Sequence, residues 1–110
     1  MSDFVTKEGD SVSHMQMTLI YPTGWVGNLT GATAQIYVER TDVRLPEPAI
    51  LMPATILNAA GALVGFADAG APTLAPGIYQ GEVKVTYNDG TVQRFPNDGF
   101  FTLDVIRSLA

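Results

Sequence analysis

The amino-acid sequence predicts an all-β fold, an antiparallel β-sandwich of about seven to eight strands. Apolar and polar residues alternate with a period of two in several segments, which is typical of strands with one buried face. Turn-forming Gly, Pro, Asn and Asp separate these segments, and no segment carries a sustained helical stripe. The connections are too short for crossover helices, so we expect no parallel sheet.

The first two predicted strands are residues 12–21 and 32–40. Their apolar faces are Met15, Met17, Leu19 and Tyr21 in the first segment and Ala32, Ala34, Ile36 and Val38 in the second. Tyr37 therefore falls on the polar face of its strand. The two prolines at 46 and 48 make residues 41–48 a loop.

Two apolar, strand-length segments follow, residues 49–57 and 63–67, joined by a turn at residues 58–61. Pro53 has no N–H to donate to a sheet ladder, so it marks an edge strand or a bulged one. Residues 49–57 are apolar on both faces. This pattern favours either burial in an assembly or irregular packing around Pro53, and the sequence leaves both open.

The most regular strand is predicted at residues 79–87. Asn88-Asp89-Gly90 then forms a hairpin turn that returns the chain into residues 91–95. After an interruption at residues 96–99 the strand continues, with Phe100 and Ile106 opposite its core-facing side. The core-facing residues are Phe101, Leu103 and Val105. A register slip at the interruption would instead place Phe100 in the core.

The position of Tyr79 indicates which type of β-sandwich the chain forms. Tyr79 follows Ala75-Pro76-Gly77-Ile78 at the start of the most regular strand. In immunoglobulin-like domains a tyrosine at this corner donates a hydrogen bond from its hydroxyl to the backbone a few residues upstream. We therefore predict an immunoglobulin-like antiparallel β-sandwich. The cysteines and the core tryptophan expected of antibody domains are missing, so the likeness concerns the architecture.

Length, charge and composition exclude several classes of protein. The 110 residues match one domain, 1–110, in which residues 1–11 are either an ordered strand or an arm that docks on a partner. The net charge of −5 argues against nucleic-acid binding. No apolar run is long enough to span a membrane, and the N-terminus lacks the features of a signal peptide.

We expect no enzyme, metal or cofactor. The single histidine, His14, neighbours Ser13, but adjacent strand residues point to opposite faces and cannot form a catalytic pair. One His and no Cys argue against a transition-metal site. Turn chemistry accounts for Asn88-Asp89-Gly90 and Asn97-Asp98-Gly99, so the only metal left open is calcium bound weakly in a loop.

Six residues are candidates for a protein–protein interface because each is a large side chain on a face or loop that a lone sandwich leaves polar: Trp25, Tyr37, Leu51, Met52, Phe100 and Ile106. Trp25 has a second interpretation as a plug that packs beneath the sandwich. The alternative function is a glycan- or receptor-binding module, with Trp25, Tyr37 and Tyr21 as a stacking platform.

Several segments resemble the immunoglobulin-like domains of tailed-phage structural proteins, closest to the N-terminal domain of the siphophage upper baseplate protein. The similar segments are Tyr21–Gly24, Leu29–Ala34, Leu74–Val83, Tyr87–Thr91 and Phe95–Val105, with Asn28 where an aspartate is usual. The resemblance implies a virion component of tail, baseplate or neck with no active site. Its implied partners are other virion proteins, in a homo-oligomer or another symmetric assembly, after synthesis in the host cytoplasm.

Overall fold

The computed structural model describes residues 3–21, 28–44, 47–96 and 99–109. These residues form eight strands and no helix, so the predicted all-β class is confirmed. No helix in this part of the chain is suited to spanning a membrane. The strands are β1 Phe4–Lys7, β2 Gln16–Thr18, β3 Thr33–Arg40, β4 Ile50–Asn58, β5 Leu63–Phe66, β6 Gly77–Thr86, β7 Val92–Phe95 and β8 Phe101–Ile106.

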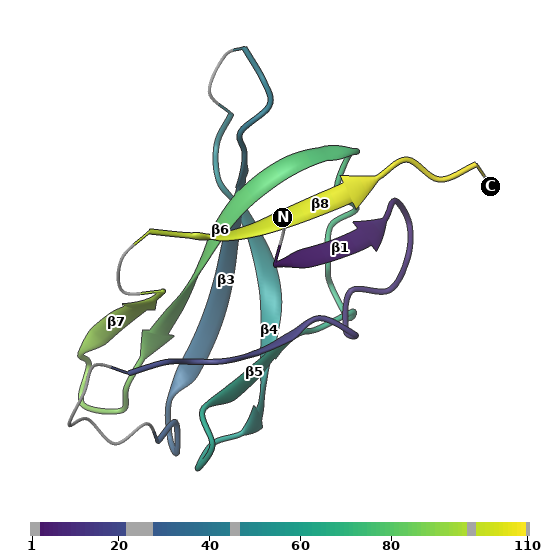
Figure 1. The fold of residues 1–110 in the computed structure, drawn as a ribbon. Coiled ribbons are helices and arrows are strands. Elements are labelled where there is room, and N and C mark those ends of the chain that lie inside the picture. The colour runs from purple at the N-terminus through teal and green to yellow at the C-terminus, as the bar shows by residue number, and fades with distance from the viewer. Residues whose placement is uncertain (1–2, 22–27, 45–46, 97–98, 110) are drawn as a thin grey trace.

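The strands form one curled, mixed sheet in the order β1-β8-β6-β3-β4-β5-β2, with β7 beside β6 (Figure 1). The expectation of purely antiparallel pairing is wrong for one pair, because β1 runs parallel to β8. The short-connection argument does not apply to this pair, since nearly the whole chain lies between the two strands. Phe4–Lys7 is thus a strand of the sheet, and this part of residues 1–11 is not a free arm.

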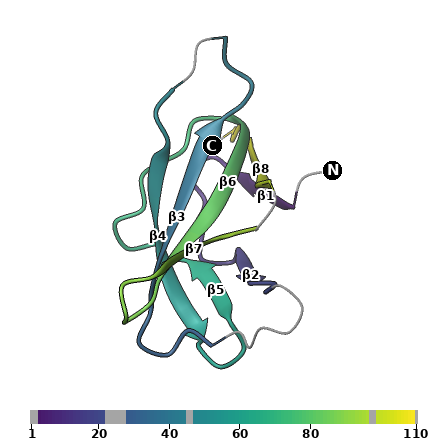
Figure 2. The same ribbon diagram turned by 90° about the vertical axis from the view of Figure 1, so that its left-hand side faces the viewer.

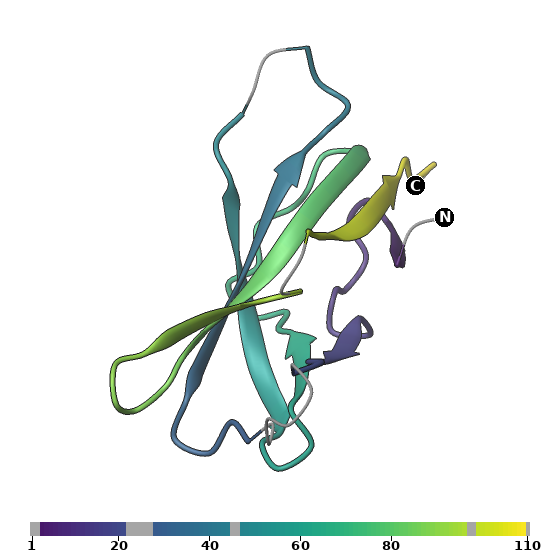
Figure 3. The same cartoon turned by 60° about the vertical axis from the view of Figure 1, so that its left-hand side comes forward.

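Three phenylalanine rings join the two ends of the curled sheet. Phe4 of β1 and Phe101 of β8 come from one end, and Phe66 of β5 comes from the other. Their ring centroids lie 5.5–6.3 Å apart in edge-to-face geometry, which is a favourable arrangement for aromatic quadrupoles. Figure 3 shows β1 and β8 curling toward the side where β5 and β2 lie.

The paired strands β3 and β6 form the centre of the sheet (Figure 2). As predicted, alternation buries one face, where Ile36 and Val38 of β3 lie beside Val83 and Val85 of β6. The opposite face carries Tyr37, Glu39 and their polar cross-strand neighbours. We call this side of β3, β4, β6 and β8 the outer face.

Strand β4 changes partner at its proline. It pairs with β3 up to Pro53 and with β5 from Ala54 onward. The predicted irregularity is therefore present, but the register shift lies between Ile56 and Asn58 rather than at Pro53. A residue without an N–H fits where a strand exchanges one hydrogen-bonded neighbour for another.

Strand β2 is much shorter than the predicted segment 12–21. Asp68 Oδ1 accepts hydrogen bonds from the backbone N–H groups of Val12 and Ser13, at 2.7 and 3.0 Å. Met15 N donates to Val12 O at 3.0 Å. These bonds hold the start of the segment as a turn, which a carboxylate far away in sequence stabilises.

The predicted corner bond at Tyr79 is present. The Tyr79 hydroxyl donates to Ala75 O at 2.7 Å, and the ring is almost fully buried. The hairpin turn after β6 is also as predicted, because Asp89 Oδ1 accepts from Thr91 N and Thr91 Oγ1 at 3.0 and 2.6 Å. Ordinary turn hydrogen bonding thus occupies the Asp89 carboxylate.

Candidate interaction surface

The outer face brings three of the six predicted interface residues together. Tyr37 of β3 is directly opposite Leu51 of β4 on one side and Glu82 of β6 on the other. Leu51 is 48% exposed, whereas Tyr37 is half-buried. Phe100, just before β8, is 52% exposed, so the alternative in which a register slip buries Phe100 is wrong.

Tyr37 and Phe100 line a shared depression over β3 and β6, which we call the β3–β6 hollow. Its volume is about 230 Å³. Val38 and Gly81 are paired positions that face inward, so they contribute backbone rather than side chains to the lining. The lining residues are Tyr37, Val38, Glu39, Ala49, Gln80, Gly81, Glu82 and Phe100.

Two carboxylates make the hollow acidic. Glu39 Oε1 accepts a hydrogen bond from Gln80 Nε2 at 2.9 Å, and no described Lys or Arg forms an ion pair with Glu39. Glu82 Oε1 lies 3.8 Å from Arg94 Nε, a long and partly exposed ion pair. Glu39 and Glu82 are diagonal neighbours across the two strands, a spacing of about 7–8 Å between backbones. Because Arg94 already lies beside Glu82, Glu39 is the carboxylate of the lining whose charge an added cation would neutralise.

Ile106 belongs to a different part of the outer face. It follows Phe101 by five residues along β8, a separation of about 17 Å at the rise of a strand. Ile106 pairs with Lys7, while Val5 and Ile78 both lie opposite Asp104. Val5, Ile78 and Ile106 are 52%, 48% and 46% exposed, so this end of the face is also apolar.

The structure does not support Met52 as an interface residue. Its side chain is fully buried, because β4 alternates and places Leu51 outward and Met52 inward. The sequence alone named both residues since every position around them is apolar. Trp25 lies outside the described residues, so its two interpretations stay as predictions.

Tyr21 is already engaged in the fold. Its ring centroid is 4.9 Å from that of Phe95, and its hydroxyl lies 2.7 Å from the Tyr87 hydroxyl. Burial, followed by the bond to Tyr87, raises the pKa of the Tyr21 hydroxyl. Tyr21 and Tyr37 line different hollows, so the described residues of the suggested glycan platform do not come together.

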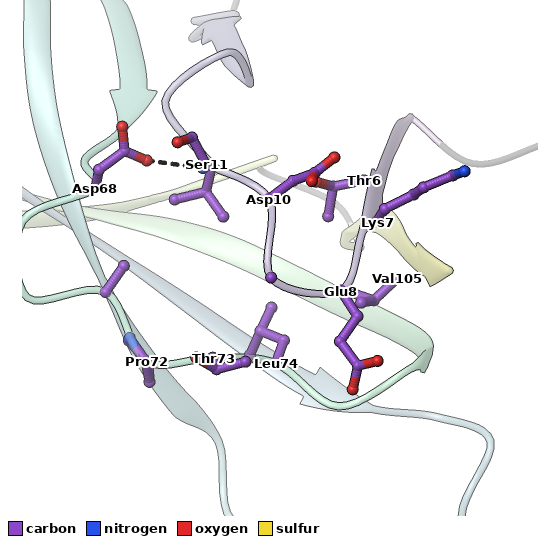
Figure 4. Close-up of a pocket in the computed structure, with 13 residues that line it drawn as sticks. Thr6, Lys7, Glu8, Asp10, Ser11, Asp68, Pro72, Thr73, Leu74 and Val105 are labelled. Atoms are coloured by element: carbon purple, nitrogen blue, oxygen red, sulfur yellow. Dashed lines mark hydrogen bonds between the residues drawn. The ribbon is translucent and has the colours of Figure 1, made fainter. Parts of the chain in front are cut away.

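A second pocket, of about 220 Å³, lies between the end of β1 and the connection after Asp68 (Figure 4). The carboxylates of Glu8, Asp10 and Asp68 point in different directions in this view. Across the described residues, no three His, Cys, Asp or Glu side chains are grouped to hold a metal ion. Thr6, at the edge of the pocket, has a buried Oγ1 without a hydrogen-bond partner.

His14 does not form a triad with its neighbours. Its Nδ1 lies 2.9 Å from Ser11 O, while Asp68 bonds to the backbone of Val12 and Ser13. A triad needs the carboxylate on the imidazole and the imidazole on the nucleophile. This geometry instead serves the turn before β2.

The sequence reasoning missed the polar half of the hollow and part of its apolar rim. Glu39 lies on the same face as Tyr37 because the two residues are two positions apart in one strand, so alternation alone could have identified it. Placing Glu82 beside Tyr37, or Ile78 beside Asp104, needs the pairing register of strands far apart in sequence.

Comparison of the chain with protein-family models, with curated proteins and with solved structures finds no match.

Proposed function

We propose that the chain is an immunoglobulin-like β-sandwich that serves as a structural component of a phage virion, in the tail, baseplate or neck. It acts by protein–protein contacts in a homo-oligomer or another symmetric assembly. The proposed virion role is supported by the segments of the sequence that resemble tailed-phage domains. These segments cover most of the chain after Val12.

Strand pairing and the tyrosine corner support the immunoglobulin-like part of the proposal. The first strand lies parallel to the last, and β6 pairs with β3 on one side and with the interrupted strand β7–β8 on the other. The Tyr79 hydroxyl bonds to Ala75 O as that corner requires. The division of β4 between β3 and β5 would make two opposed layers of one curled sheet.

The observation that carries the assembly role is the apolar content of the outer face. Leu51, Ile78 and Ile106 on their strands, and Phe100 just before β8, are each about half exposed, while the inward faces of these strands already supply the core. Burying such a side chain contributes roughly 1–2 kcal/mol. Several of them on one face would contribute to a contact with a second protein.

Mass spectrometry of purified particles from the source tests the proposed role. We expect the protein to be detected as a stoichiometric component, made in the host cytoplasm and retained in the virion. Its absence from intact particles would overturn the proposal. Light scattering on the purified chain then shows whether it oligomerises alone or only with its neighbours.

A further inference from the structure

The β3–β6 hollow combines features that each select a cation. Tyr37 and Phe100 supply aromatic rings, and Glu39 and Glu82 supply carboxylates within the same lining. Rings attract a cation through their negative faces, and carboxylates pair with it directly. A neutral sugar would not form an ion pair with these carboxylates, and they would repel an anion.

We propose that the β3–β6 hollow receives an arginine side chain of a different protein in the assembly. This inference rests on the assembly role proposed above and names the chemistry of the partner. A planar guanidinium stacks on an aromatic ring and also donates paired hydrogen bonds to a carboxylate. A volume of about 230 Å³ admits such a side chain from the outer face.

Charge on this chain favours a different protein over a second copy. The net charge is −5, so two copies repel each other at long range. Two of the four arginines are engaged within the chain, since Arg40 pairs with Asp42 at 3.2 Å and Arg94 lies near Glu82. A basic loop or strand of a neighbouring protein meets the acidic hollow without that penalty.

The test is an NMR titration of the full chain with acetyl-Gly-Arg-Gly-amide. The control peptide carries citrulline, which keeps the shape of arginine and removes its charge. We expect the arginine peptide to shift the resonances of Tyr37, Phe100 and Glu39, and the citrulline peptide to shift them several-fold less. The same shifts with both peptides would overturn the proposal.

Variants assign the effect to the hollow. Glu39→Gln and Phe100→Ala should each weaken binding of the arginine peptide by about tenfold, or about 1.4 kcal/mol. Asp104→Asn is the matched control, because it removes the same charge from the outer face outside the hollow and should leave binding unchanged. Equal weakening by Asp104→Asn would mean that only the net charge matters, and would overturn the site.

Two further outcomes separate this inference from the assembly role. Concentration-dependent shifts at Tyr37 and Phe100 without any peptide would identify a second copy as the occupant, and overturn the arginine proposal alone. Detection of the protein in particles together with no preference for arginine would have the same effect. Arginine-selective binding by a protein absent from particles would support the hollow and remove the virion role.

Discussion

A single hydroxyl group ties the connection before β6 to the core. Tyr79 donates to Ala75 O at 2.7 Å while its ring lies among buried side chains. Tyr79→Phe removes the bond, keeps the ring and leaves the carbonyl without that partner. We expect the free energy of unfolding to fall by about 1–2 kcal/mol in urea denaturation.

Tyr37→Phe is the control for Tyr79→Phe. The Tyr37 hydroxyl bonds to Gln35 Oε1 at 3.2 Å on the exposed side, where water replaces a lost partner. Its loss should change the free energy of unfolding by less than about 0.5 kcal/mol. Equal effects of the two substitutions would mean that the corner bond is not a special contribution.

Thr6 presents the opposite case, a buried hydroxyl without a partner. Its Oγ1 makes no hydrogen bond, and the side chain faces the core beside Val105. Thr6→Val keeps the branched shape and removes the unpaired polar atom. We expect the free energy of unfolding to rise by about 1 kcal/mol.

Thr6→Ser makes the complementary change, because it keeps the hydroxyl and removes a buried methyl group. This variant should lose about 1 kcal/mol of stability in the same urea measurement. Destabilisation by both substitutions would show that the Thr6 hydroxyl has a partner in solution.

Asp68 makes the stability of the β2 region depend on pH. Hydrogen bonds from Ser13, and then from the backbone N–H of Val12, hold the pKa of the Asp68 carboxyl below its usual range. A lowered folded-state pKa means that the ionised form stabilises the fold. This contribution is complete above the unfolded-state pKa and is lost as the pH falls through the folded-state pKa.

We therefore expect acidification from about pH 6 to about pH 3 to lower Tm more in the wild type than in Asp68→Asn. The carboxylates of Asp42 and Asp89, whose pKa values are also lowered, are common to both proteins and cancel in the comparison. Parallel melting curves for wild type and Asp68→Asn would refute the assignment.

At the scale of elements, the Phe101 ring of β8 occupies the space over β6 in which a side chain at Gly81 would lie. A Cβ at this position would lie 2.8 Å from both Phe101 Cε1 and Tyr37 O. Gly81→Ala must therefore displace a buried ring and a strand backbone. Urea denaturation should show a loss of at least about 2 kcal/mol.

Gly65→Ala in β5 is the matched strand control. The nearest contact of its added Cβ would be Leu57 Cδ1 at 2.9 Å, and Leu57 is 46% exposed and can rotate away. Its cost should be clearly smaller than that of Gly81→Ala. The reverse order would show that Phe101 does not pack against Gly81 as described.

The sequence predicted the elements best where alternation is set by one buried face. The inward residues of β3 and β6 follow this pattern directly. It failed at β2, because Asp68 is 56 residues away from the N–H of Val12 that it binds. It also failed at the parallel pairing of β1 with β8, since no local pattern records which distant strand completes a sheet edge.

The candidate site was predictable only in part for the same reason. Alternation places Tyr37, Phe100 and Ile106 outward, as the structure has them. It does not decide between Leu51 and Met52 in a segment that is apolar throughout. The hollow depends on the registers of β3 with β4 and β6, which fix Tyr37 between Leu51 and Glu82.

At the scale of the whole molecule, the inner and outer faces of the sheet have different roles. The inner face contains a continuous core closed by the contacts of Phe4, Phe66 and Phe101. The outer face holds exposed apolar side chains at both ends and the acidic hollow between β3 and β6. The central claim is that another protein covers this outer face.

Hydroxyl-radical footprinting of the chain, free and within purified particles, tests this claim most directly. Leu51 and Phe100 should react several-fold less in the particle than in the free protein, because a partner excludes water from them. Leu57, exposed on the part of β4 beyond Pro53, serves as a reference within the same strand. Equal reactivity of Leu51 and Phe100 in the two states would contradict the claim.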